Sequence, residues 1–292
     1  MRRPRYRLAA WALVTSLAVL ALAACGDQAA PSTGAPASGG TLELFVGSAT
    51  KPATEEVVQL FEDRYGVRVD LHFGGSGAML SQMKLTERGD IYFPGSSDFM
   101  EEAKRRGLVL PQTERRVVYL IPAINVQKGN PEDIQSLEDL ARPGLKVAIA
   151  DPETVCVGLY ALEVLEKSGL AEAVRPNIAT YTESCAKTAR VVALKNVDAV
   201  IGWRVFQYWS PEEIETVYLS PDQVPRIGYV PIAISTFSKQ PELAQQFIDF
   251  VTSDEAGAIY GKWHYLTTVE EAREFAPEAE VGGEWELPEG WP

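Results

Sequence analysis

Short β-type segments alternate with amphipathic helical segments along most of the chain, and this alternation restricts the fold more than any other feature. Residues 42–46 are apolar except for Glu43, and residues 67–73 alternate apolar with polar side chains, as a strand with one buried face does. Between them, residues 52–65 begin with proline and repeat bulky apolar side chains at intervals of four, which predicts a helix. A strand–helix–strand order favours a parallel α/β sheet.

The pattern continues in two series separated by two long apolar segments, residues 117–126 and 226–234. We expect a two-lobed α/β protein in which each lobe is a mainly parallel sheet flanked by helices and two crossover strands join the lobes. The predicted strands are 90–93, 146–150, 198–203 and 214–219, and the predicted helices are 77–87, 97–106, 158–168, 185–194, 242–251 and 254–263.

The crossover segments also predict where the lobes divide. Residues 41–121 together with 232–292 would form one lobe, and residues 122–231 the other. Ligands of open α/β sheets bind beyond the carboxyl ends of the strands, so the cleft between the lobes is the expected site.

The N-terminus has the pattern of a secretory signal. Four arginines lie within the first seven residues, an apolar run follows at 8–22, and Leu-Ala-Ala-Cys at 22–25 resembles the bacterial lipobox. We expect a signal peptide at 1–24, lipid on Cys25, and a flexible linker over 25–40, which has no bulky apolar side chain. The protein would then be extracytoplasmic and anchored to the membrane by lipid. An uncleaved anchor, or secretion with a free Cys25, is the alternative.

The charge balance excludes nucleic acid as a partner. Without the four N-terminal arginines, 23 basic residues face 40 acidic ones, a net charge of −17. Phosphate backbones are bound through clustered lysine and arginine. A hydrophobic content of 46% is that of an ordinary globular protein.

Five predicted turns before helices consist mainly of small residues. Such residues let a ligand approach backbone N–H groups, and each helix N-terminus adds about half a positive charge. Several of them in one cleft would bind an anion without lysine or arginine. The alternative is that serine and glycine only cap these helices. The turns are residues 47–50, 74–77, 94–97, 155–158 and 183–186.

The order of short motifs resembles the molybdate-binding receptors of ABC importers, which have a two-lobed periplasmic-binding-protein fold. The resemblance covers nearly the whole chain after the signal. The motifs are Gly-Ser at 47–48, Gly-Gly-Ser-Gly at 74–77, Gly-Asp-Ile-Tyr-Phe at 89–93, Asp-Pro-Glu at 151–153, Gly-Leu-Tyr-Ala at 158–161, Asp-Ala at 198–199, Trp-Arg at 203–204 and Lys-Trp at 262–263.

This resemblance implies a binding site for a tetrahedral oxyanion, molybdate or tungstate first and sulfate or phosphate as alternatives. Ser48 and Ser76 would supply hydroxyl and amide donors, and Gly95, Val157 and Cys185 would supply backbone amides. It also implies permease subunits of an ABC importer as partners. We expect a monomer without a cofactor.

Two features depart from the family. Trp203 stands where the family has a ligand-binding tyrosine; an indole donates but cannot accept a hydrogen bond, and Trp203 is otherwise a core residue. The resemblance also brings Cys156 and Cys185 to one cleft. Three readings are open for this pair: a disulfide, inert thiols, or reduced thiols that bind a soft centre such as arsenite, helped by helix termini that depress thiol pKa values.

An enzyme is the remaining alternative. Residues 74–78 nearly match the G-x-S-x-G elbow of serine hydrolases, with Ser76 as nucleophile, but the final glycine is missing. His72 and His264 are the only histidines, and both are expected at the surface. Because zinc-ligand spacing, C-x-x-C and the P-loop are also absent from the sequence, we predict a receptor with no catalytic residues and no bound metal.

Overall fold

The computed structural model describes residues 40–291, and its first sheet gathers strands from both ends of this range. The sheet order is β11-β10-β3-β1-β2, and β4 pairs with β10. β1 runs parallel to β2 and β3, whereas β10 runs antiparallel to β3 and β4. The strands are β1 (Thr41–Gly47), β2 (Arg68–Gly74), β3 (Ile91–Phe93), β4 (Arg115–Leu120), β10 (Arg226–Ile234) and β11 (Glu280–Val281).

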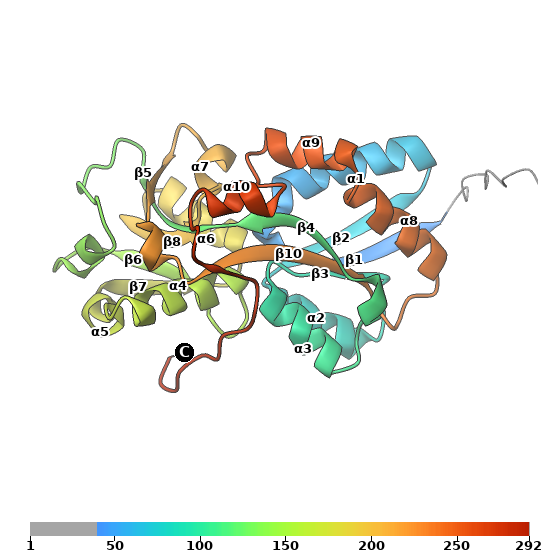
Figure 1. Cartoon of the computed structure of the whole chain (residues 1–292), viewed down its shortest axis with the longest axis horizontal. Helices are drawn as coiled ribbons and strands as arrows, with labels where there is room; N and C mark the ends of the chain where they lie inside the picture. The colour runs from blue at the N-terminus through green and yellow to red at the C-terminus, as the bar shows by residue number, and fades with distance from the viewer. Residues whose placement is uncertain (1–39, 292) are drawn as a thin grey trace, which may run out of the picture. The chain divides into compact units, whose positions relative to one another are not determined.

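Helices cover both faces of this sheet. In Figure 1, α1 and α9 lie on one face, and α2 and α3 lie on the other. Phe61 of α1 anchors the packing, because its ring lies 5.0 Å from that of Phe247 and 5.4 Å from that of Phe250. α1 ends at Gly66, whose φ of 64° suits glycine. The helices are α1 (Lys51–Tyr65), α2 (Ser76–Thr86), α3 (Ser97–Arg105), α8 (Pro241–Val251) and α9 (Asp254–Lys262).

A second sheet has the strand order β7-β6-β8-β5-β9. β7, at one edge, runs parallel to β6, and β6 runs parallel to β8, whereas β5 runs antiparallel to β8 and β9. α4 is buried over ten of its twelve residues. The elements are β5 (Pro122–Gln127), β6 (Val147–Ala150), α4 (Cys156–Lys167), α5 (Ala171–Val174), β7 (Ile178–Thr182), α6 (Cys185–Ala193), β8 (Ala199–Trp203), α7 (Phe206–Trp209) and β9 (Ile214–Tyr218).

The predicted two-lobed α/β architecture is confirmed. We call the first sheet with its helices the first lobe, and the second sheet with its helices the second lobe. The segment at 117–126 divides before Pro122 into β4, which belongs to the first sheet, and β5, which belongs to the second. Because β4, β5 and β10 run antiparallel to neighbouring strands, both sheets are mixed.

The C-terminal segment contacts both lobes. It includes α10 (Val269–Arg273) and β11, which pairs with β10. In Figure 1 the segment after α10 crosses in front of β10. Ala272, Ala276 and Trp291 nevertheless belong to the apolar cluster of the second lobe. The predicted boundaries at 121/122 and 231/232 remain predictions, and 232–292 is not packed on one lobe alone.

The predictions for the N-terminus, namely the signal peptide 1–24, the lipid on Cys25 and nearly all of the linker 25–40, lie outside the described residues. Over residues 40–291, no helix is both long and apolar enough to span a bilayer.

Candidate functional site

Ser48 and Ser76 lie side by side at one edge of the first sheet. Parallel pairing puts Gly47 at the end of β1 opposite Gly74 at the end of β2, so the turns that follow leave the sheet together. Ser76 is the first residue of α2, and Ser48 begins a short 3-10 turn before α1. Both side chains are buried.

Cys156 and Cys185 hold the matching positions in the second lobe. They are the first residues of α4 and α6, and these helices follow the parallel strands β6 and β7. Both cysteines are about 1% exposed. Four helices of nine residues or more, α2, α3, α4 and α6, thus begin at turns that the sequence analysis selected.

The two lobes are in direct contact at these turns. The Ala186 amide donates a hydrogen bond to Ser48 Oγ at 3.2 Å, and the Gly77 amide donates to the Thr154 carbonyl at 2.8 Å. We call this contact the interlobe seam. It comprises Ser48, Gly75, Ser76, Gly77 and Gly95 of the first lobe with Thr154, Cys156, Val157, Cys185 and Ala186 of the second, Val157 through its amide beside Cys156.

Glycine at position 95 allows the seam to close. A Cβ atom on Gly95 would lie 2.5 Å from Cys156 Sγ and 2.9 Å from the Cβ of Ala49, closer than van der Waals contact permits. The Gly95 amide donates to Ser76 Oγ at 2.9 Å. Two residues predicted to bind the ligand, Ser76 and Gly95, therefore hydrogen-bond to each other with a second-lobe sulfur beside them.

The cysteine pair lies at the centre of the seam as two free thiols. Their sulfur atoms are 3.5 Å apart. Burial raises the pKa of the Cys156 thiol well above its ordinary value, and the neighbouring Cys185 raises it further, against the opposing effect of the Ser76 hydroxyl and Val157 amide. The expectation that helix termini depress the thiol pKa is therefore wrong for Cys156, because desolvation outweighs the hydrogen bonds from Ser76 and the Val157 amide.

Trp203 is buried in the core beside the seam. Its ring packs edge-on against Tyr160 of α4, with the ring centres 5.0 Å apart, and its indole N–H has no hydrogen-bond partner. Arg204 points away: it donates to the carbonyl of His264 and lies over the ring of Phe275. No positively charged side chain belongs to the seam.

The histidines have other partners. His72 Nε2 lies 2.9 Å from Glu43 Oε1, and His264 stacks on Tyr208 with ring centres 3.7 Å apart. The Ser76 hydroxyl has Gly95 rather than a histidine as its partner. Among residues 40–291, no three His, Cys, Asp or Glu side chains come together as a metal site would require.

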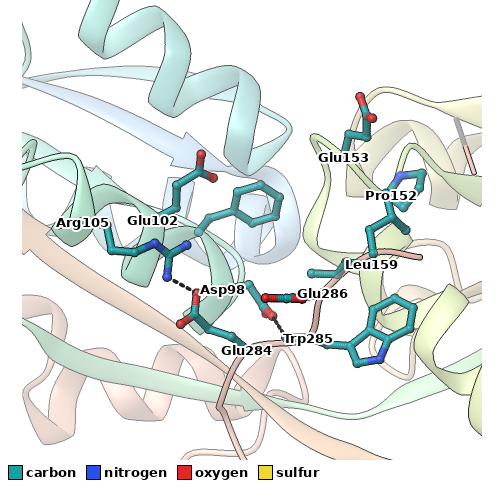
Figure 2. A pocket seen from close by; sticks show the side chains of 11 residues that line it. Asp98, Glu102, Arg105, Pro152, Glu153, Leu159, Glu284, Trp285 and Glu286 are labelled. Atoms are coloured by element: carbon teal, nitrogen blue, oxygen red, sulfur yellow. Dashed lines mark hydrogen bonds and ion pairs between the residues drawn. The ribbon is translucent and has the colours of Figure 1, made fainter. Parts of the chain in front are cut away.

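An acidic cavity of about 630 Å³ adjoins the seam. Phe99 and Glu153, which line it, both approach Gly77. Figure 2 shows Arg105 directed at Glu284 and Asp98 at the Trp285 backbone, with the second-lobe residues opposite. Five carboxylates face one arginine here. The lining residues are Asp98, Phe99, Glu102, Arg105, Pro152, Glu153, Leu159, Glu284, Trp285, Glu286 and Leu287.

Behind this cavity, a buried ion cluster joins the lobes and the C-terminal segment. Arg226 of β10 donates to Glu163 Oε2 of α4 at 2.7 Å and lies 3.1 Å from Asp98 Oδ1 of α3. It also donates to the Gly283 carbonyl at 2.9 Å. Burial raises the pKa of Asp98 above its ordinary value even though Arg226 is beside it.

Comparison with known proteins decides the family. The family described as "Bacterial extracellular solute-binding protein" matches residues 42–266. The chain belongs to this family. It is therefore an extracellular solute-binding protein, and such a protein is a receptor rather than an enzyme.

Relatives and solved structures agree with this assignment. The solute-binding protein is 25% identical over 244 residues to the molybdate-binding protein ModA of Mycobacterium tuberculosis, covering 82% of this chain and 91% of the relative. The sulfate-binding protein SubI of M. tuberculosis has a TM-score of 0.73 at 16% identity, covering 84% of this chain and 94% of that structure. The periplasmic molybdate-binding protein of Azotobacter vinelandii has a TM-score of 0.68 at 18% identity, covering 78% and 99%. The two structures support the fold alone.

The seam of this solute-binding protein collects most of the residues that the sequence selected. Five of them lie in it, and Trp203 packs against Tyr160 of α4 instead; the five are Ser48, Ser76, Gly95, Val157 and Cys185. Sequence reasoning selected the turn 183–186 but did not name Ala186 as a donor, although its amide crosses to Ser48, and it missed the cluster around Arg226. Ala186 follows a selected residue directly. No sequence pattern near Arg226 indicates that it pairs with Asp98.

Proposed function

We propose that this protein is the receptor of an ABC importer and that it encloses a small tetrahedral oxyanion of the molybdate or tungstate type in the interlobe seam. One observation carries the proposal. Ser48 and Ser76 meet the N-termini of α4 and α6 in a buried contact without a cationic side chain. Buried hydroxyls and amides at helix N-termini are the donors that hold a desolvated anion.

The ligand would replace hydrogen bonds that now join protein groups. The Gly95 amide donates to Ser76 and the Ala186 amide to Ser48. With an oxyanion between the lobes, both amides and both hydroxyls would turn to its oxygen atoms. The Trp203 indole N–H, buried without a partner, is a further donor nearby. Sulfate and phosphate have the same tetrahedral shape and are the alternative ligands.

The names of relatives support an oxyanion. The M. tuberculosis relative is named as molybdate-binding, and one of the similar structures is named as sulfate-binding. The acidic cavity opposes long-range attraction of anions, so short-range donors at the seam must supply the affinity. A serine hydrolase is not proposed, because neither histidine contacts Ser76.

The partners follow from this role. A closed receptor would present its ligand to permease subunits in the membrane, acting as a monomer tethered through lipid on Cys25 after cleavage of residues 1–24. The lobes would move about the crossings at 121/122 and 231/232; the pairing of β10 with β4 is irregular between Val230 and Pro231.

Metabolic labelling with a radioactive fatty acid tests the proposed lipid anchor. The label should enter the wild-type protein and should not enter the Cys25→Ala variant.

Thermal unfolding with added oxyanions tests the binding proposal. A ligand that binds only the native state raises the midpoint by mass action. Molybdate or tungstate should raise it, and Ser48→Ala with Ser76→Ala should remove the increase. An unchanged midpoint with molybdate, tungstate, sulfate and phosphate would refute the proposal.

A further inference from the structure

Two thiols occupy the part of the seam where the ligand is proposed to lie. Cys156 and Cys185 come from different helices of the same lobe, and both are buried with sulfur atoms 3.5 Å apart. Across from Cys156 lie the Ser76 hydroxyl and the Gly95 backbone of the first lobe. An atom bound to Cys156 Sγ in the seam would therefore lie close to Cys185 Sγ as well.

The sulfur separation fits two bonds to one central atom. A disulfide holds its sulfur atoms about 2.05 Å apart, far closer than this pair. Two thiolates bound tetrahedrally to one zinc at about 2.3 Å each would lie roughly 3.8 Å apart, close to the 3.5 Å found here. Small side chains around the pair mean that such an atom would be enclosed from both lobes.

The number of protein ligands, two thiols, indicates which kind of central atom the site could bind. Within the described residues, no His, Asp or Glu joins the two cysteines to form a three-ligand cluster. Structural zinc requires four protein ligands, so this site does not suit it. A trivalent metalloid accepts two thiols and keeps a hydroxyl in its third position, and sulfur ligands favour such soft centres.

We infer that Cys156 and Cys185 bind a trivalent, thiophilic oxyacid of the arsenous acid type in the interlobe seam. This inference rests on the proposed function only for the location of the ligand between the lobes. Each thiol gives its hydrogen to one hydroxyl group of the oxyacid. Two As–S bonds form, two As–O bonds break and two water molecules leave, while arsenic stays trivalent and nothing is oxidised or reduced.

The electrostatics of the site suit a neutral oxyacid. The seam has no lysine or arginine, and the adjoining cavity has five carboxylates against one arginine. Burial raises the pKa of the Cys156 thiol, which keeps it protonated at neutral pH. Condensation of neutral thiols with a neutral oxyacid leaves no net charge in the buried site, so desolvation costs little. The third hydroxyl then faces Ser76.

Arsenite binding to the purified, reduced chain tests the inference. The experiment uses a Cys25→Ala background, so that only two thiols are present. Native mass spectrometry should detect one arsenic per chain, with loss of both titratable thiols, and the unfolding midpoint should rise. Cys156→Ser and Cys185→Ser should each weaken arsenite binding at least 100-fold. Unfolding midpoints of these variants without ligand verify that they fold, and Cys156→Ala provides a second substitution.

The outcomes separate this inference from the proposed function. A midpoint shift with molybdate or tungstate but no arsenic adduct overturns the inference and leaves the proposed function standing. An arsenic adduct that persists in Cys156→Ser also overturns it, as does a disulfide that resists a phosphine reductant. An adduct that needs both cysteines supports the inference, even if every tetrahedral oxyanion fails to bind and the proposed function falls.

Discussion

The Gly77 amide of the first lobe donates a hydrogen bond to the Thr154 carbonyl of the second at 2.8 Å. Two residues earlier, a Cβ on Gly75 would lie 2.7 Å from the same carbonyl and 3.0 Å from that of Glu183. The lobes thus meet backbone to backbone, and glycine is what lets them approach. Because the lobes approach this closely, only a small ligand can be enclosed between them.

Gly75→Ala should impair closure without unfolding either lobe. The added methyl group meets second-lobe atoms only, so it opposes the closed state and leaves the first-lobe core intact. We expect oxyanion affinity to fall by about tenfold or more, since about 1.4 kcal/mol of opposing strain is enough. Titration calorimetry measures the change. Gly257→Ala, in α9 with open space around it, is the matched control and should bind as the wild type does. Equal affinity for Gly75→Ala would contradict closure through this contact.

Ser76→Ala should reduce both affinity and stability. The Gly95 amide loses the acceptor it has at 2.9 Å, and a buried unpaired donor costs about 1–3 kcal/mol. Urea unfolding measures the change in the free energy of unfolding, and titration with tungstate measures the change in oxyanion affinity. Ser81→Ala, exposed on the same helix, controls for helix propensity and should change neither. Full affinity in Ser76→Ala would remove this serine from the site.

Arg226→Met should be the most destabilising of these substitutions. It leaves the buried Asp98 carboxylate without its cation and Glu163 with only the half-exposed Lys167, and breaking a buried ion pair costs about 3–5 kcal/mol. The unfolding midpoint should fall by roughly 10 °C. Arg64→Met is the control: Arg64 forms a solvent-exposed pair with Glu255 at 2.6 Å, and solvent screening leaves such a pair with little effect on stability. Similar unfolding midpoints for Arg226→Met and Arg64→Met would contradict the claim that burial makes the Arg226 ion pairs the more important ones for stability.

Glu43 should make stability depend on acid pH. Burial alone would raise the pKa of Glu43, but hydrogen bonds from Arg88 and His72 outweigh it and hold the pKa below its ordinary value. The unfolded chain therefore binds the proton more tightly, and Glu43 stabilises the fold above about pH 4.5. This contribution disappears as the pH falls through the folded-state pKa.

The measurement is the free energy of unfolding of the wild type and Glu43→Gln between neutral and acid pH. Their difference should be largest near neutrality and shrink on acidification. Glu55→Gln, at an exposed position of α1, should track the wild type throughout. A difference that grows with falling pH would contradict the assigned sign.

The sequence predicted elements whose signal is local. The predicted helix at 52–65 matches α1 within one residue, and that at 77–87 lies within one residue of α2, because apolar spacing and turn residues mark both. β7 was missed, since Ile178–Thr182 is half exposed at a sheet edge and has no apolar run. β11 was missed too, because only its pairing with β10 makes those two residues a strand.

The site was predictable in outline. Gly-Ser turns at strand ends can be read from the sequence, and parallel pairing then brings them together. The contacts that cross between the lobes were not predictable, because Ala186 to Ser48 and Arg226 to Asp98 depend on how distant elements pack. The prediction of a lowered thiol pKa was wrong for the same reason. The burial that raises the pKa of Cys156 results from packing between the two lobes.

Titration calorimetry of the purified, thiol-reduced protein with tungstate and molybdate tests the central claim most directly. The account predicts one ligand per chain, with sulfate and phosphate as weaker competitors and at least tenfold weaker binding in Ser76→Ala. A folded protein that gives no binding heat or competition with any tetrahedral oxyanion would contradict it.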